Sequence, residues 1–312
     1  MFISIIITTY NRCEHLKIVF TSLLAQRKNQ GLEYEVLVID NNSTDRTRDA
    51  VLEGQSRFEG RLKYFLESRQ GKSFAMNLGI KEAKGDILFF TDDDVILDEN
   101  WLFKILECYE AYGCDAVGGR VLPVFPEGTA PWIIQNAKKL SGAVVIYENG
   151  EKTFQLKNAE DRFIGANFSV KRSVAQEVGG FCVEIGPGAA IGLGEDVDFF
   201  KKLLAGGKVV YYCYQAVVHH PFDSRRLTLK HTAKWNIQLG RYMAWASLKN
   251  GENFVFYGKI PRYLYRAVIL DTCKLAFSWW DKAKFFIAWR SFFYKIGLIL
   301  GYKQFYLKLR KA

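Results

Sequence analysis

Cysteine pairs are absent from this sequence of 312 residues. The six cysteines form no Cys-x-x-Cys pair and no tight cluster; they stand at positions 13, 108, 114, 182, 213 and 273. This spacing argues against a zinc ribbon and against a disulfide framework, and it favours a reducing compartment.

The glycine-rich loops that cradle phosphates are also missing. No G-x-G-x-x-G follows the first strand-like run, and no G-x-x-x-x-G-K-[ST] occurs anywhere. The segment RQGKS at 69–73 lacks the first glycine and the spacing of such a loop. These absences argue against a dinucleotide-binding dehydrogenase and against a P-loop enzyme.

Long apolar runs are missing as well. In the C-terminal third no uncharged stretch exceeds 7 residues, far below the roughly 18 that span a bilayer. The opening MFISIIITTYNR has no basic residue ahead of its short apolar run. We therefore expect a buried first strand there rather than a signal peptide.

The chain does contain enough apolar material for a large core. Hydrophobic residues make up 49% and aromatic residues 15% of the sequence, which excludes disorder for the bulk of the chain. Its length fits one large α/β domain or a domain with an appendage.

Positive charge gathers in the C-terminal third. Residues 221–312 hold 18 Lys and Arg against 4 Asp and Glu, whereas residues 1–220 hold 25 against 29. The same third carries 21 of the 47 aromatic residues of the chain. An anionic partner would therefore meet mainly the C-terminal third.

Strand-like and helix-like segments alternate in the first half of the chain. The apolar patterns predict strands at 2–8, 34–40, 61–67 and 86–91, and helices at 14–26, 44–54 and 73–83. Such alternation predicts a mostly parallel sheet with right-handed crossovers, in which ligands gather at the carboxyl ends of the strands. The polar strand ends at 8–10, 40–42 and 91–94 should therefore converge on one crevice.

Three adjacent aspartates, residues 92–94, follow the fourth predicted strand. Like charges at contact distance repel unless a cation lies among them, so the triplet indicates a bound or neighbouring cation. The alternative is a solvated turn before a helix, whose N-terminus favours acidic residues. A second acidic group opens a predicted helix at 195–207, after a glycine-rich loop at 179–194.

Seven segments occur in the order seen in inverting family 2 nucleotide-sugar glycosyltransferases, which the chain resembles over residues 1–245. They are SIIITTYNR, VLVIDNNSTD, GKSFAMNLGI, DILFFTDDDV, GANFSV, GEDVDFF and VVHHP. The resemblance implies a Rossmann-like, mixed but mostly parallel sheet flanked by helices, the glycosyltransferase A-type fold. We expect a catalytic domain at 1–225 and a helical, basic, aromatic-rich extension at 226–312.

The resemblance also implies roles for matching residues. Asp40 would bind the base, Tyr10 would stack, Arg12 would meet the diphosphate, and Asp92 would lean toward the ribose. Asp94 and His220 would ligate Mn²⁺ or Mg²⁺, with His219 left as the alternative to His220. The full nucleotide-sugar set is Thr8, Tyr10, Arg12, Asp40, Lys72, Asn77, Asp92 and Asp93.

The same comparison of motifs points to the reacting centre. Asp196 would be the general base that an inverting displacement needs, with Glu195 orienting the acceptor or the loop. The alternative is that both acids only complement the helix dipole. Asn167 would hydrogen-bond sugar hydroxyls, and Trp101 would stack on a pyranose ring.

The function expected is therefore metal-dependent transfer from a nucleotide sugar, UDP-sugar first, to a hydroxyl of a cell-envelope glycan or lipid-linked acceptor. The tail would place the enzyme at the cytoplasmic face of the plasma membrane, on anionic lipid; a helical cap or a homo-oligomer interface is the alternative. Two other hypotheses are a nucleotidyltransferase, which normally has a glycine-rich segment after its first strand, and a nucleic-acid-binding protein. We expect no nucleic-acid partner, because the basic residues of the tail alternate with bulky apolar ones.

Overall fold

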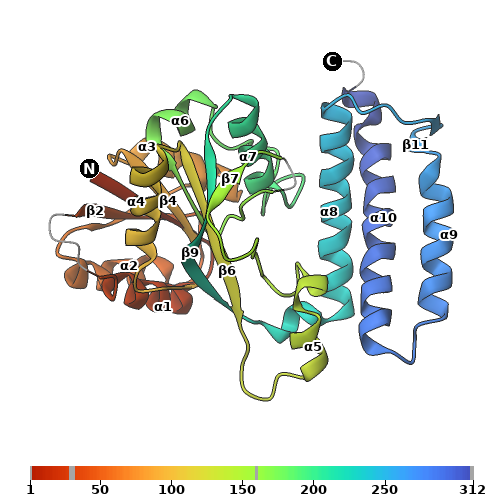
Figure 1. The fold of residues 1–312 in the computed structure, drawn as a ribbon, viewed down its shortest axis with the longest axis horizontal. Helices are drawn as coiled ribbons and strands as arrows, with labels where there is room; N and C mark the ends of the chain where they lie inside the picture. Colours follow the sequence, from red (N-terminus) through yellow and green to blue (C-terminus); the bar gives the residue numbers. More distant parts are fainter. Residues whose placement is uncertain (1, 28–31, 159–160, 310–312) are drawn as a thin grey trace. The chain divides into compact units, whose positions relative to one another are not determined.

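The computed structural model describes residues 2–27, 32–158 and 161–309. The chain divides into two compact units (Figure 1). The first comprises Met1–Val124, Val145–Ala189 and Glu195–Pro221, and the second comprises Phe125–Val144, Ala190–Gly194 and Phe222–Ala312. The second unit therefore takes in a segment, Phe125–Val144, that lies inside the range expected for the catalytic domain.

Four parallel strands form one half of the sheet in the first unit. They lie in the order β3-β2-β1-β4, and β1 pairs with both β2 and β4. Their bounds are β1 Phe2–Thr9, β2 Glu33–Asp40, β3 Leu62–Leu66 and β4 Ile87–Asp92. The register sets Thr9 opposite Asp40 and Thr8 opposite Asp92. The polar ends of β1, β2 and β4 thus meet at one edge of the sheet, as the alternating pattern predicted.

The other half of the sheet is mixed. It continues from β4 in the order β8-β6-β9-β5, and β7 also pairs with β9. β8 is antiparallel to both β4 and β6, and β6 runs parallel to β9. The bounds are β5 Ile96–Leu97, β6 Ala116–Val124, β7 Phe154–Leu156, β8 Asn167–Lys171 and β9 Val210–Pro221.

Helices cover both faces of this sheet. Successive β1 residues such as Ile5 and Ile6 belong to two separate hydrophobic clusters, because their side chains point to opposite faces of the sheet. The first cluster includes residues of α1 and α4, and the second includes residues of α3, α6 and α7. A mixed sheet between helical layers confirms the predicted fold class. The helices are α1 Cys13–Leu24, α2 Thr47–Gln55, α3 Lys72–Glu82, α4 Trp101–Tyr112, α6 Arg172–Glu177 and α7 Glu195–Ala205, with the 3₁₀ turn η1 Ser56–Phe58.

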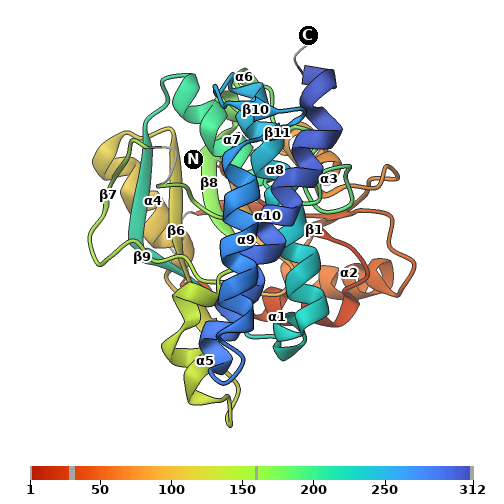
Figure 2. The same ribbon diagram turned by 90° about the vertical axis from the view of Figure 1, so that its right-hand side faces the viewer.

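The second unit is mainly helical. Helices α8, α10 and α9 run side by side in both views (Figures 1 and 2). Gly240 of α8 and Gly297 of α10 let the backbones touch, since a Cβ on Gly240 would lie 2.2 Å from the Tyr294 carbonyl oxygen. The elements are α5 Pro131–Gln135, η2 Ala137–Leu140, η3 Ser224–Leu227, α8 Leu229–Lys249, β10 Phe256–Tyr257, β11 Ile260–Pro261, α9 Tyr263–Ala276 and α10 Lys282–Leu309.

Among the residues that the structure describes, no helix combines the length and the apolar character needed to cross a bilayer.

Candidate active site

The loops after β1 and β2 lock together at the carboxyl edge of the sheet. Asn11 adopts a left-handed backbone with φ 53°, and its side-chain oxygen accepts a hydrogen bond from the Thr44 N–H at 2.7 Å. The Asn11 N–H in turn donates to the Ser43 hydroxyl at 2.8 Å. These reciprocal bonds hold Tyr10, which is exposed, and Thr8, which is half-buried, at the tip of β1.

Asp40 is buried at the end of β2. Its carboxylate accepts hydrogen bonds from the Tyr64 hydroxyl at 2.8 Å and from the Ser43 N–H at 2.9 Å. Burial and the neighbouring carboxylate raise the pKa of Tyr64 to about 12. Tyr64 was missed in the sequence, although the strand pairing carries the signal. Tyr64 lies opposite Val38, and the period of two puts its side chain on the same face as Asp40.

The three adjacent aspartates share two basic partners, Lys72 and Arg12. Asp92 accepts a hydrogen bond from Lys72 Nζ at 2.7 Å. Asp93 and Asp94 both pair with the guanidinium of Arg12, at 3.1 Å for Asp93. Burial raises the pKa of Asp93 to about 6, even though Arg12 opposes the shift. The positive charge of Arg12 thus offsets the repulsion between the Asp93 and Asp94 carboxylates.

His220 brings an imidazole to the same acids. Its Nε2 lies 3.4 Å from Asp94 Oδ1, and its Nδ1 lies 2.9 Å from the Pro221 carbonyl oxygen. The Pro221 carbonyl oxygen can only accept, so Nδ1 donates to it and Nε2 is the ring nitrogen that faces Asp94. His219 projects from the opposite face of β9, because successive strand residues alternate.

These donors fit a divalent cation that shares its shell with a substrate. An imidazole nitrogen and a carboxylate oxygen are both ligands that divalent cations such as Mn²⁺ accept. Nowhere in the described ranges do three or more His, Cys, Asp or Glu side chains gather as a metal site. Hard cations of this kind use one or two protein ligands and complete their shell with phosphate oxygens and water. Asp94 and His220 would be those two ligands.

A second charged group lies where α3 and α7 begin. Lys72, the first residue of α3, places its Nζ 3.7 Å from a carboxylate oxygen of Glu195, the first residue of α7. Glu195 is buried, and burial raises its pKa to about 7 although Lys72 opposes the shift. Lys72 therefore bridges Glu195 and Asp92, two acids that are distant in the sequence.

Asp196 is held by backbone donors. Its Oδ2 accepts from the Gly165 N–H at 2.9 Å, and its Oδ1 accepts from the Val197 N–H at 2.8 Å. The side chain is only partly buried. A carboxylate fixed in orientation yet open to solvent retains lone pairs for an incoming hydroxyl proton.

Three residues that the resemblance assigns to the nucleotide sugar make contacts within the protein instead. Asn77 uses both ends of its amide to hold the backbone of Phe181, at 2.8 and 2.9 Å. Trp101 and Asn167 are both 0% exposed and hydrogen-bond each other at 2.8 Å. Trp101 also packs edge-on against Phe89 in the core. With no exposed surface, neither Trp101 nor Asn167 presents in this structure the sugar contact that the resemblance implies.

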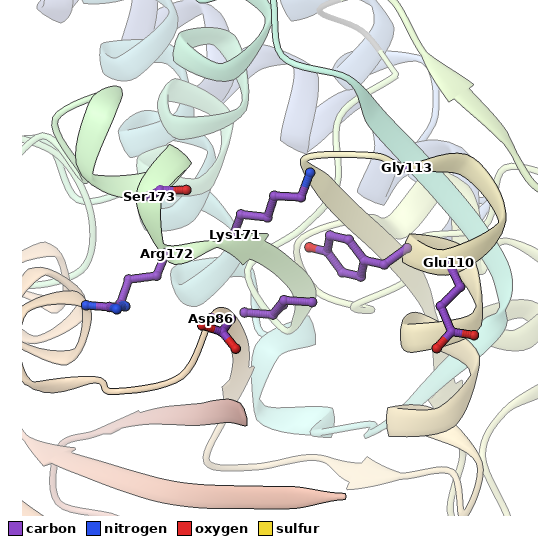
Figure 3. Close-up of a pocket in the computed structure, with 8 residues that line it drawn as sticks. Asp86, Glu110, Gly113, Lys171, Arg172 and Ser173 are labelled. Atoms are coloured by element: carbon purple, nitrogen blue, oxygen red, sulfur yellow. The ribbon is translucent and has the colours of Figure 1, made fainter. Parts of the chain in front are cut away.

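A separate pocket lies at the opposite edge of the sheet (Figure 3). It includes Ile87, which begins β4, and Lys171, which ends the antiparallel β8. Its two basic residues are already engaged, since Lys171 pairs with Asp115 and Arg172 donates to the Gly85 carbonyl. This pocket is therefore distinct from the acidic edge.

Three comparisons with known proteins bear on this site. The model of the family described as glycosyl transferase family 2 matches residues 4–179. Glycosyltransferase AglE of Haloferax volcanii is 26% identical over 222 residues, which cover 70% of this chain and 67% of AglE. Dolichol-phosphate mannosyltransferase of Pyrococcus furiosus is 33% identical over 121 residues, 38% of this chain and 33% of that protein.

A solved structure agrees with the fold. The mannosyltransferase PcManGT from Pyrobaculum calidifontis, in complex with GDP-Man and Mn²⁺, superposes with a TM-score of 0.61. The match covers 96% of this chain and 86% of that one at 16% identity. Identity this low supports the shared fold alone.

Proposed function

The chain belongs to glycosyl transferase family 2, and we propose that it is a metal-dependent inverting enzyme. It would move a sugar from a nucleoside-diphosphate donor, UDP-sugar first, to a hydroxyl of a cell-envelope glycan or lipid-linked acceptor. One observation carries this proposal. Asp94, His220 and Arg12 meet at the strand edge where Lys72 also joins Asp92 to Glu195. Family membership leaves the nucleotidyltransferase and nucleic-acid-binding hypotheses without support.

The metal would be Mn²⁺ or Mg²⁺ on Asp94 and His220, and the imidazole favours Mn²⁺. When bound, such a cation neutralises the negative charge that develops on the leaving diphosphate. PcManGT carries Mn²⁺ together with its donor, which supports the assignment by analogy. Arg12, which pairs with Asp93 and Asp94, would offer its guanidinium to a phosphate once another cation neutralises those acids.

Asp196 would act as the general base. An inverting transfer is a single displacement, so one group must take the proton of the acceptor hydroxyl. The two backbone N–H bonds hold the Asp196 carboxylate in place before the acceptor arrives. Glu195, with its raised pKa, would orient the acceptor or the preceding loop through its contact with Lys72.

The nucleotide would lie over the tips of β1 and β2. Tyr10 is exposed there and can stack on a base, while Asp40 has oxygen lone pairs beyond those used by Tyr64 and Ser43. Thr8 and Asp92 face each other across the strand pair beside them. When the ribose of the donor binds beside Asp92, Lys72 would leave Asp92 and move toward the donor.

The acceptor and the location follow from the relatives and from the tail. A match to a dolichol-phosphate mannosyltransferase supports a lipid-linked acceptor. The excess of basic residues after residue 220 supports association with an anionic membrane. We place the enzyme at the inner face of the plasma membrane.

The proposal is tested by assaying the purified protein against a panel of UDP- and GDP-sugars. We expect one donor to be hydrolysed slowly with Mn²⁺ and not after chelation with EDTA, and to raise the melting temperature only when metal is present. A panel in which no donor binds or reacts, with or without metal, would overturn it.

A further inference from the structure

Helix α9 exposes large apolar side chains together with arginines on one face. Tyr257, Arg262, Tyr265, Arg266, Ile269 and Leu270 line a shallow groove there and are called the α9 face. Five of these six residues follow a helical spacing from Arg262 to Leu270, so their side chains form one stripe. Ile269 is 64% exposed and Leu270 is 49% exposed.

The opposite side of α9 already serves as the packing side of the helix. Leu264 is fully buried in a cluster with Leu298 and Tyr302 of α10. Asp271 is 1% exposed and pairs with Lys295 of α10. The α9 face is therefore a second apolar surface on a helix whose ordinary packing is complete, and such surfaces mark interaction sites.

The apolar stripe continues into the turn between α9 and α10. Phe277 stands 15 positions after Arg262 and keeps the helical spacing of the stripe. Phe277, Trp279 and Trp280 are 73%, 74% and 62% exposed and are called the aromatic tip. Three large rings in water at one turn are costly unless a partner covers them, and tryptophan favours the interface between water and lipid.

The charge of this region selects the partner. Between residues 253 and 309 the only acids are Asp271 and Asp281. Asp271 is buried in its ion pair, and Asp281 pairs with Lys284 at 3.3 Å. Arg266 and Lys274 of α9 are exposed, as is Arg262, which directly precedes the helix. The surface thus offers positive charge beside apolar rings and leaves no acid on α9 exposed.

We propose that the α9 face and the aromatic tip dock onto the surface of an anionic lipid bilayer. Arg262 and Arg266 lie one turn apart and bind lipid phosphates, while Ile269, Leu270 and the tip enter the headgroup layer. This inference rests on the membrane association within the proposed function and names the surface responsible.

Two other partners fit less well. A second copy of the chain, packed face to face, would bring Arg262, Arg266 and Lys274 against the same residues, and α9 exposes no acid to pair with them. Nucleic acid would use the arginines and the rings, yet the aliphatic Ile269 and Leu270 have no role in stacking on bases. An anionic bilayer can bind the arginines, the aromatic rings and the aliphatic side chains together.

Vesicle co-sedimentation of the full chain tests the inference. Vesicles of equal parts phosphatidylcholine and phosphatidylglycerol should bind the protein, and vesicles of phosphatidylcholine alone should bind it far less. Arg262→Gln with Arg266→Gln should weaken binding to the mixed vesicles by roughly tenfold or more at low salt. Trp279→Ser with Trp280→Ser should weaken vesicle binding at low and at high salt, because salt does not screen the apolar contacts that these substitutions remove.

Matched controls lie in the other unit. Arg46→Gln with Arg57→Gln removes the same charge from exposed positions of the first unit, and Leu52→Ser removes an exposed apolar side chain of α2. Both should bind vesicles like the parent protein. Quenching of tryptophan fluorescence by brominated lipid in the parent protein checks insertion of the tip without any substitution.

The outcomes separate this inference from the proposed function. If the parent protein hydrolyses a nucleotide sugar but ignores anionic vesicles, the membrane surface is wrong and the activity stands. If it binds vesicles but turns over no donor, the proposed activity fails and the surface stands. Equal binding by the α9 variants and the controls, displacement from vesicles by duplex DNA, or an α9-dependent dimer in sedimentation would each overturn the inference.

Discussion

His220 Nε2 lies 3.4 Å from Asp94 Oδ1, although the two residues are 126 positions apart in the sequence. The short strand β5 makes this possible, because Ile96 pairs with His219 and so brings the end of β9 beside the acids after β4. The pairing places an imidazole nitrogen beside a carboxylate oxygen, and both are ligands that a shared divalent cation accepts.

His220→Ala should weaken Mn²⁺ binding by about tenfold or more, because it removes one of only two protein ligands. Isothermal titration calorimetry in the presence of UDP measures this directly. His219→Ala is the control and should bind Mn²⁺ like the parent protein, since its ring projects from the other face of β9. Equal losses in the two variants would mean that the histidines act through the fold and not through the metal.

Arg12→Gln should destabilise the metal-free protein by about 1–3 kcal/mol, because Asp93 and Asp94 lose the charge that pairs with them. Added Mn²⁺ should restore more stability to this variant than to the parent protein, since the ion replaces the missing charge. Thermal unfolding with and without Mn²⁺ gives both values. Arg46→Gln breaks an exposed pair with Asp49 and should cost less than about 1 kcal/mol. An Arg12 variant that gains nothing extra from Mn²⁺ contradicts the account.

Glu195 should make stability fall as pH rises. Its folded pKa of about 7 lies above the ordinary value of 4.5, so its contribution is complete below pH 4.5 and is lost as pH rises through about 7. Glu195→Gln removes this penalty, and its stability relative to the parent protein should increase by about 3 kcal/mol between pH 4.5 and pH 8. Chemical denaturation at a series of pH values measures the difference.

Glu184→Gln is the control for that series, because it makes the same change at an exposed position outside the site. A flat difference for Glu195→Gln would show that its carboxylate is not held in the low-dielectric setting described.

Asp196→Asn should lower transfer to the acceptor by about 10²–10⁴-fold while leaving donor binding nearly unchanged, because an amide cannot take the hydroxyl proton. Single-turnover transfer and calorimetric titration of the donor separate the two effects. Asp198→Asn is the matched control two residues later on the same helix, where the carboxylate is buried beside Lys202. Normal transfer by Asp196→Asn would place the base on another residue.

The alternation of strands and helices was enough to predict the edge at which the site lies. Parallel pairing brings the ends of β1, β2 and β4 together whatever the loops do, so Thr8, Asp40 and Asp92 could be placed from pattern alone. The period of two along β9 likewise separates His220 from His219.

Which partner each side chain takes could not be predicted in the same way. The Trp101 indole N–H donates to the Asn167 side-chain oxygen in the core. The sequence does not show that this N–H has a buried acceptor. Arg12 pairs with Asp94 directly after Asn11, whose left-handed backbone is not evident from the sequence. Phe125–Val144 belongs to the helical unit through contacts such as that of Trp132 with Phe286. A local sequence pattern does not predict contacts between residues this far apart in the chain.

Pulsed electron paramagnetic resonance of Mn²⁺ bound to the protein with UDP reports the ligands themselves. The spectra should contain a ¹⁴N coupling from one imidazole and ³¹P couplings from the diphosphate on the same ion, and Asp94→Asn or His220→Ala should remove the imidazole signal. Mn²⁺ that shows phosphorus couplings but no nitrogen coupling, and that is unchanged in Asp94→Asn, would contradict a cation held between these strand ends and the leaving diphosphate.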